Sequence, residues 1–138
     1  MRVLIDTSAW SVALRRQTTA PRPPVAAQIE AIIRDGRAVI IGPIRQELLS
    51  GIRDPHQFEA LRNHLRAFPD LSIAQADHEL AAEVSNLCRR KGIQGSGVDL
   101  LICAVAIRAE LAILTTNQDF QRYATVVDLR ILPIEATV

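Results

Sequence analysis

Short aliphatic runs alternate with amphipathic segments along the chain, and this pattern predicts strands that alternate with helices. Residues 3–5 and 38–41 are continuous aliphatic runs, and residues 111–116 are aliphatic up to Leu114; such runs are typical of strands buried on both faces of a sheet. Weaker strands are expected over residues 70–73 and 126–134. Strands joined by helices predict right-handed crossovers and a parallel sheet. The expected fold class is therefore α/β, with three α/β/α layers around a central parallel sheet of about five strands.

Helical periodicity or a favoured helix start marks six segments: residues 9–16, 25–34, a helix that opens at Gly42 and Pro43, 55–67, 77–91 and 98–107. Residues 18–24 are expected to form a loop, because three of the last four are proline. The last predicted helix is apolar nearly all round, so it should be buried. Asp99 is its only charged residue.

Four acidic residues stand at positions that a parallel sheet would bring together. Asp6 directly follows the first strand, and Asp119 lies just beyond the third aliphatic run. Glu47 lies early in the helix that opens at Gly42, and Asp99 lies in the first turn of the buried helix. Strand carboxyl ends and the helix starts that follow them point to one edge of such a sheet. We therefore expect these four side chains to converge.

Converging carboxylates predict a bound metal ion. Like charges would raise one another's pKa and oppose folding unless a cation neutralised them. Carboxylate oxygens without a paired His or Cys suit hard divalent ions, so Mg²⁺ or Mn²⁺ is the expected occupant. Asp6 and Asp99 are the best candidates for direct ligands. Glu47 and Asp119 would hold a second ion, bind the first through water, or act as base toward the attacking water.

Such a site predicts hydrolysis of a phosphodiester. A bound divalent ion lowers the pKa of its water and stabilises charge on the phosphate, so no covalent protein intermediate is needed. Hydroxyl and amide side chains beside the acids are candidates to orient the carboxylates and waters: Thr7, Ser8, Thr115, Thr116 and Asn117.

Each acid also has a purely structural explanation. Asp6 is a favoured N-cap residue for the helix that follows it, and Asp99 would interact favourably with its helix dipole. Glu47 taken singly is typical of a surface glutamate. Asp119 follows Asn117 closely enough to belong to an Asx-type turn. What favours a functional role is the joint placement of all four.

Length and composition narrow the class of protein. The chain has 138 residues, is 49% hydrophobic and carries a net charge of +1, which predicts a single domain over residues 1–138 with its own core. Its longest uncharged apolar run, residues 100–107, is far shorter than the ~20 residues of a membrane span. No stretch of signal-peptide type is present, so we expect a cytoplasmic protein without membrane contact. Cys88 and Cys103 lack metal-binding spacing and are expected to be reduced, buried thiols.

Four segments in a fixed order carry a family resemblance: residues 3–10 (VLIDTSAW), 42–51 (GPIRQELLSG), 98–104 (VDLLICA) and 114–120 (LTTNQDF). Each motif is weak alone, but their order and spacing run through essentially the whole chain. With this set of motifs the chain resembles the PIN-domain ribonucleases of the VapC toxin type, which occur in bacterial and archaeal toxin-antitoxin pairs.

The resemblance implies a single PIN-like domain and a Mg²⁺-dependent endoribonuclease, the toxic component of a type II toxin-antitoxin pair. It implies an RNA substrate, a homodimer, and a cognate antitoxin that binds it in a hetero-oligomer. By motif position, Asp6, Glu47 and Asp99 carry over as the acidic core. Many relatives have an acid where this chain has Asn117, so the fourth position falls to Asp119 or to the amide oxygen of Asn117.

Two other functions would use the same residues. One is a PIN-fold module without catalysis, which binds RNA or protein and carries vestigial acids; the intact trio Asp6, Glu47 and Asp99 argues against it. The other is a metal-dependent DNA nuclease or phosphatase that uses the same acidic cluster. Parallel assays on RNA, DNA and a phosphomonoester separate these activities.

Overall fold

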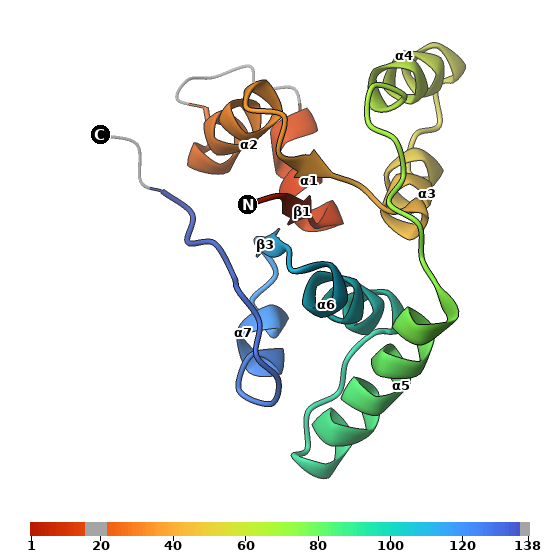
Figure 1. Cartoon of the computed structure of the whole chain (residues 1–138). Coiled ribbons are helices and arrows are strands. Elements are labelled where there is room, and N and C mark those ends of the chain that lie inside the picture. The colour runs from red at the N-terminus through yellow and green to blue at the C-terminus, as the bar shows by residue number, and fades with distance from the viewer. Residues whose placement is uncertain (16–21, 136–138) are drawn as a thin grey trace.

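Three short parallel strands form the centre of the protein. The computed structural model describes residues 1–15 and 22–135, and Figure 1 shows their arrangement. The strands are β1 (Val3–Ile5), β2 (Ala38–Val39) and β3 (Ala112–Leu114), and β1 lies between the other two. Val3 is paired with Ala38 on one side and with Ala112 on the other, and both pairings are parallel. The expected α/β class with a parallel sheet is confirmed.

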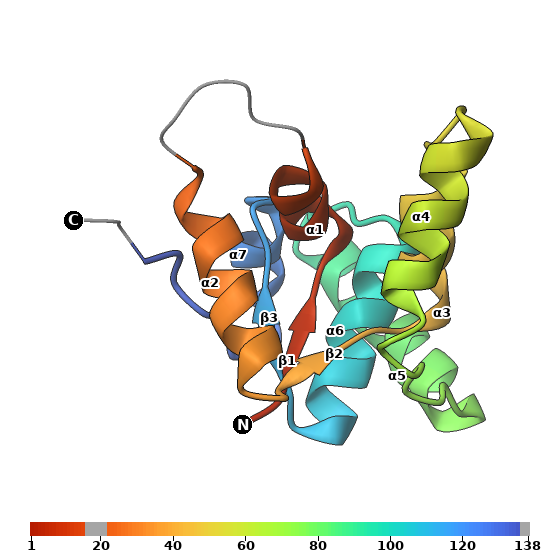
Figure 2. The same cartoon turned by 90° about the horizontal axis from the view of Figure 1, so that it is seen from above.

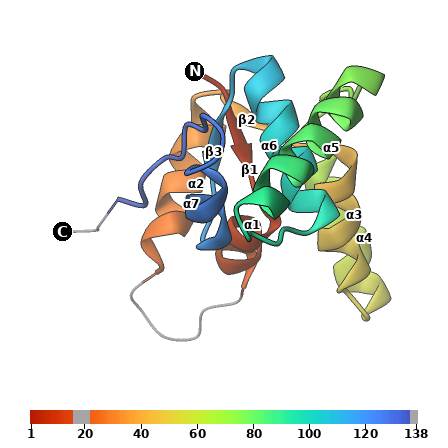
Figure 3. The same ribbon diagram turned by 90° about the horizontal axis from the view of Figure 1, so that it is seen from below.

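Helices cover both faces of this sheet. They are α1 (Thr7–Leu14), α2 (Pro24–Arg34), α3 (Gly42–Ser50), α4 (Pro55–Leu65), α5 (Gln75–Arg90), α6 (Gly97–Ala109) and α7 (Asp119–Tyr123). Figure 1 shows α1 and α2 on one face, α6 with α5 outside it on the other, and α3 and α4 beyond β2. Figures 2 and 3 show the same layers from two further directions, with α7 near β3.

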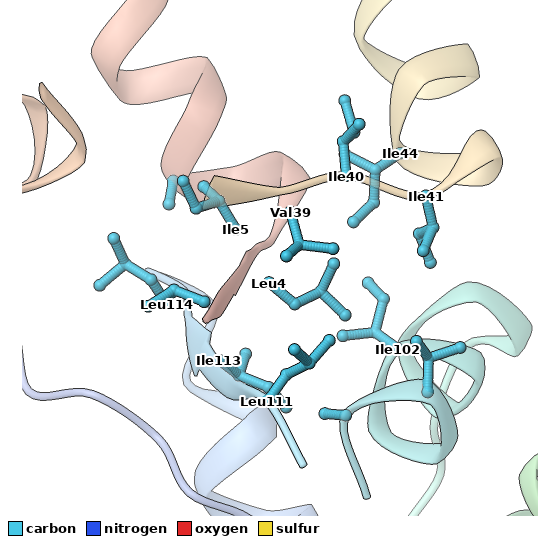
Figure 4. Packing of buried hydrophobic residues seen from close by; sticks show 14 of the residues in the cluster. Leu4, Ile5, Val39, Ile40, Ile41, Ile44, Ile102, Leu111, Ile113 and Leu114 are labelled. Carbon is cyan, nitrogen blue, oxygen red and sulfur yellow. The ribbon is translucent and has the colours of Figure 1, made fainter. Parts of the chain in front are cut away.

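The sheet is buried because its strands are aliphatic on both faces. All three residues of β1 have 0% exposure, and Figure 4 shows Leu4 among Val39, Ile113 and Ile102. Removal of this apolar surface from water is the main contribution of such a core to stability. The expected burial of the apolar helix is confirmed, since residues 100–106 of α6 are all buried.

The described residues form three strands rather than about five, and the edge beyond β2 is one reason. Residues 70–73, expected as a weak strand, pair only through a single parallel bridge between Asp70 and Ile40. Toward the amino end, Pro69 has no N–H to donate to β2. Toward the carboxyl end, Gly42 already begins α3. At this edge the backbone can therefore form only the single bridge between Ile40 and Asp70.

The opposite edge is limited in a similar way. Of the weak strand expected over residues 126–134, Ile131 alone forms a bridge, to Ile113 of β3. The ladder does not extend backward, because the N–H of Leu111 donates instead to the carbonyl of Ala106 where α6 ends, at 2.9 Å. The end of α6 therefore uses the Leu111 N–H, which a longer ladder at this edge would need.

Five helices expected over defined ranges lie within two residues of those ranges at each end, whereas α7 was not expected at all. Five residues are too few to show helical periodicity, so the hydrophobic pattern carries no signal for α7. Of the loop expected over residues 18–24, residues 18–21 lie outside the described part of the chain, and Pro24 is the first residue of α2.

Arg45 fixes α3 against the chain that follows α4. Its guanidinium donates to Asp70 Oδ1 at 2.9 Å, to the carbonyl of Leu65 at 3.0 Å and to the carbonyl of Phe68. Charge-assisted bonds from a planar guanidinium hold their partners in a defined geometry. This contact sets the position of α3, and with it that of Glu47 two residues farther along.

Cys88 and Cys103 are buried and form no disulfide, as expected from the sequence. Burial raises the pKa of the Cys103 thiol to about 12, so it stays protonated and unreactive. Within residues 1–15 and 22–135, no helix combines the length and apolar character that a bilayer crossing requires.

Candidate functional site

Asp6 occupies the carboxyl end of β1 and is held there by two hydroxyl groups. Its side chain is buried, with 4% of the residue exposed. Although Asp6 is the residue before α1, its carboxylate makes no capping hydrogen bond to that helix. Instead, Oδ2 accepts from Ser8 Oγ at 2.7 Å and from Thr115 Oγ1 at 2.8 Å. The purely structural explanation of Asp6 as a helix cap is therefore wrong.

Backbone donors lock these two hydroxyls in place. The N–H of Thr116 donates to Ser8 Oγ at 3.0 Å, and the N–H of Asn117 donates to Thr115 Oγ1 at 3.0 Å. Each hydroxyl accepts one N–H and has a single hydrogen, which is within hydrogen-bond reach of Asp6 Oδ2, and the two hydroxyl oxygens also lie 3.1 Å from each other. Oδ2 is thereby fully engaged. Oδ1 accepts no hydrogen bond from the described residues. It is also not among the buried polar atoms that lack a partner, so it is accessible to a ligand.

Asp99 lies in the first turn of α6, where the Ser96 hydroxyl caps the helix by accepting the Asp99 N–H at 3.1 Å. The Asp99 carboxylate is thus free of capping and instead accepts the Tyr123 hydroxyl at Oδ2, at 2.9 Å. Partial burial raises the pKa of Asp99, repulsion from Asp6 and Asp119 raises it further, and the hydroxyl groups of Tyr123 and Ser96 beside the carboxylate oppose the rise. The charges of Asp6 and Asp119 therefore both act on the Asp99 carboxylate.

Glu47 reaches the same edge from α3. It is an exposed residue, and its Oε1 accepts the Thr7 hydroxyl at 3.1 Å. Thr7 directly follows Asp6, so this bond connects α3 to the end of β1. A solvated carboxylate with one hydrogen bond keeps its other oxygen available to water or a cation. Glu47 therefore lies at the rim of the site rather than in its buried part.

Asn117 and Asp119 have different roles at the start of α7. The amide oxygen Oδ1 of Asn117 accepts the Asp119 N–H at 3.0 Å and closes an Asx turn just before α7, so the structural alternative expected for this pair is confirmed. The Asp119 carboxylate is half-exposed and lies 3.9 Å from the Arg122 guanidinium. The negative charge of Asp119 also contributes to the raised pKa of Asp99.

The five candidate orienting residues contact different parts of the site. Ser8 and Thr115 donate to Asp6, Thr7 donates to Glu47, and Asn117 accepts the backbone N–H of Asp119. Thr116 takes part through its backbone N–H, which holds Ser8. Eight of the nine residues expected to form the site lie at the carboxyl ends of β1 and β3 or at helix starts nearby. Glu47 was expected early in its helix but is the sixth of the nine residues of α3, and it reaches this edge through its bond with Thr7.

The donor set suits a hard divalent ion. Its atoms are carboxylate and hydroxyl oxygens, and the charges of Asp6 and Asp99 act on each other, as the raised pKa of Asp99 shows. Among the described residues, no three His, Cys, Asp or Glu side chains form a ready-made metal cage. Mg²⁺ usually keeps several waters and is held by one or two carboxylates, so a pair such as Asp6 and Asp99 is sufficient for it.

Comparison with known proteins identifies the family. The family model described as the PIN domain matches residues 3–126, which is most of the chain. The chain belongs to the PIN-domain family. Ribonuclease VapC11 of Mycobacterium tuberculosis is 30% identical over 132 residues, which cover 93% of this chain and 96% of that protein. The VapC ribonuclease Mb1587 of Mycobacterium bovis matches with the same identity and coverage. The VapC-type resemblance expected from the motifs is confirmed.

Solved structures have the same fold at lower identity. FitAcB from Neisseria gonorrhoeae superposes with a TM-score of 0.75 at 18% identity, covering 95% of this chain and 96% of that chain. VapBC2 from Rickettsia felis, bound to a DNA fragment from its promoter, gives a TM-score of 0.73 at 19% identity, covering 96% and 98%. The PIN fold of this chain is therefore shared along nearly its whole length.

Sequence reasoning missed Tyr123 and Ser96, two residues that contact Asp99 in this PIN domain. Ser96 had a readable signal, because a serine three residues before an acid at a helix start is typical of an N-cap. Tyr123 had none, since α7 was not expected and the contact joins residues on two separate helices.

We expect Asp99→Asn to raise the unfolding temperature of this PIN domain in chelator at about pH 7. The folded chain holds the Asp99 proton more tightly than the unfolded chain, so its ionisation lowers stability as the pH rises through that range. An asparagine carries no charge and still accepts from Tyr123. Thermal unfolding at about pH 7 and about pH 3, where both states are protonated, measures the effect. A variant no more stable than the parent at the higher pH would contradict it.

Proposed function

We propose that this PIN-domain protein is a metal-dependent endoribonuclease, the toxic component of a type II toxin-antitoxin pair. The observation that carries the proposal is that Asp6 at the end of β1 and Asp99 at the start of α6 each have one oxygen held by hydroxyl donors, and that Asp6 contributes to the raised pKa of Asp99. The similarity to proteins named ribonuclease VapC supports the reaction class.

In this proposal Asp6 and Asp99 hold a Mg²⁺ ion, with Mn²⁺ as its substitute. When bound, the cation supplies a water of lowered pKa and positive charge beside the phosphodiester. Ser8 and Thr115 keep Asp6 from rotating. Glu47, exposed and bonded to Thr7, takes the proton of the attacking water, and Asp119 contributes negative charge that favours the cation.

We further propose a cognate antitoxin as protein partner and a homodimer as the oligomeric form, in keeping with the expectations drawn from the motifs. Support for the partner comes from the solved relatives, which include VapBC2 of Rickettsia felis and a toxin-antitoxin complex from Klebsiella pneumoniae with a TM-score of 0.67. Co-purification of the chain with the product of a neighbouring reading frame, followed by light scattering, measures both.

Removal and return of metal test the proposed reaction. Purified protein should cleave single-stranded or structured RNA in Mg²⁺ or Mn²⁺, stop in excess EDTA, and resume when Mg²⁺ is added back. Single-stranded DNA and a phosphomonoester run beside the RNA as comparison substrates. Cleavage that survives EDTA, or a preference for DNA or the phosphomonoester, would overturn the proposal, and RNA binding without turnover would favour the non-catalytic module.

A further inference from the structure

Tyr123 is a buried residue with its polar end at the candidate site. Only 1% of it is exposed, and its ring packs edge-on against Phe120 with centroids 5.2 Å apart and an interplanar angle of 78°. Its hydroxyl donates to Asp99 Oδ2 at 2.9 Å. A phenol with its ring enclosed on all sides presents its hydroxyl in one direction, so this donor is pre-organised for the carboxylate.

Gly95 makes the position of the ring possible. A Cβ at residue 95 would lie 3.0 Å from both Cε1 and the hydroxyl oxygen of Tyr123, and 3.2 Å from Cδ2 of Leu100. Carbon atoms ordinarily approach to about 3.5–4.0 Å, so even an alanine would displace the ring. The φ of Gly95 is not positive, so the space, rather than the backbone conformation, requires glycine. Gly95, in the loop before α6, is thus packed directly against Tyr123, the residue that contacts Asp99.

The contact distinguishes the two oxygens of Asp99. Oδ2 is occupied by the phenol, while Oδ1 accepts no hydrogen bond from the described residues. Asp6 has the same arrangement, with Oδ2 occupied by two hydroxyls and Oδ1 open. A metal ligand whose second oxygen is hydrogen-bonded is fixed in orientation before the metal arrives, and loss of such a partner weakens metal binding.

We propose that Tyr123 is a positioning residue for Asp99, holding Oδ2 so that Oδ1 is presented to the divalent cation, and that Gly95 is required for this placement. This proposal rests on the proposed function, because it takes Asp99 as a metal ligand. It assigns α7 a role in the chemistry beyond carrying Asp119: through Tyr123 the short helix controls the geometry of a ligand on α6.

Mn²⁺ binding to the purified protein, followed by the electron paramagnetic resonance signal of free Mn²⁺, tests the proposal without any turnover. Tyr123→Phe keeps the ring and loses the hydroxyl, and we expect its Mn²⁺ dissociation constant to rise about 10-fold or more. Gly95→Ala keeps the hydroxyl but displaces it, and should weaken Mn²⁺ binding in the same direction. Thr125→Val is the matched control, because its hydroxyl bonds the carbonyl of Arg122 at the end of α7 and does not contact the site.

Parallel measurement of Asp99→Asn separates the two proposals. If Asp99→Asn loses Mn²⁺ binding while Tyr123→Phe and Gly95→Ala bind as tightly as the parent, the role of Tyr123 is overturned and the metal site stands. If Asp99→Asn binds Mn²⁺ like the parent, or the parent binds none, both proposals fail. Weakened binding in the Tyr123 and Gly95 variants, with Thr125→Val unchanged, supports the positioning role.

Discussion

Asp6→Asn and Asp99→Asn should each lower metal-dependent RNA cleavage by more than about 100-fold, because even the partners that orient a metal ligand are worth 10–100-fold. Asparagine has nearly the shape of aspartate but lacks the charge that attracts a divalent ion. At Asp6 the amide oxygen of asparagine can still accept from Ser8 and Thr115, which leaves the NH₂ group in place of the open oxygen Oδ1. Initial rates of RNA cleavage at several Mg²⁺ concentrations measure the loss.

Asp128→Asn is the matched control for these two variants. Asp128 is an exposed acid that lines a hollow with Met1 and Glu110, at the amino ends of the strands and so opposite the site. It removes the same charge from the same protein, and its activity should stay within about twofold of the parent. Equal losses in all three variants would mean that net charge, rather than the acidic site, governs cleavage.

Leu4→Ala should lower the free energy of unfolding by about 2–5 kcal/mol, since it deletes a fully buried side chain and leaves a cavity. Leu4 has 0% exposure in the central strand and lies among side chains of β2, β3 and α6 (Figure 4). A loss of this size is a large part of the about 5–15 kcal/mol that stabilises an ordinary domain. Urea denaturation followed by circular dichroism measures it.

Leu87→Ala tests whether burial is the cause. Leu87 lies on α5 with 39% of its surface exposed, and the same substitution there should change the free energy of unfolding by no more than about 0.5 kcal/mol. A comparable loss from both substitutions would show that the centre of the sheet is not the part of the core that dominates stability.

The parallel sheet and its covering helices were predictable because burial on both faces leaves a plain signature in the sequence. Residues 3–5 and 112–114 are aliphatic without interruption and became β1 and β3. The number of strands was not predictable in this way. Pairing at Asp70 and Ile131 is limited to single bridges, because Pro69 lacks an N–H and the Leu111 N–H is already bonded to Ala106. The hydrophobic pattern carries no information about these backbone donors.

For the site, the sequence indicated which elements carry the acids but not how each acid is held, and among the described residues the four acids do not close into one metal cage. From the order of strands and helices, Asp6, Asp99 and Asp119 were expected at one edge of the sheet, and the charges of Asp6 and Asp119 do raise the pKa of Asp99. The sequence left open whether Asp6 caps α1, because a cap and a ligand occupy the same position before a helix. Its bonds to Ser8 and Thr115 decide against the cap, and one of these partners lies 109 positions away in the chain.

A crystal of the protein soaked in Mn²⁺ and examined at the manganese absorption edge tests most directly whether the gathered acids form a metal site. The predicted result is an anomalous peak bound by carboxylate oxygens of both Asp6 and Asp99, which disappears in crystals of Asp99→Asn. A peak that contacts neither residue, or none at a Mn²⁺ concentration that supports RNA cleavage, would show that Asp6 and Asp99 do not form the metal site.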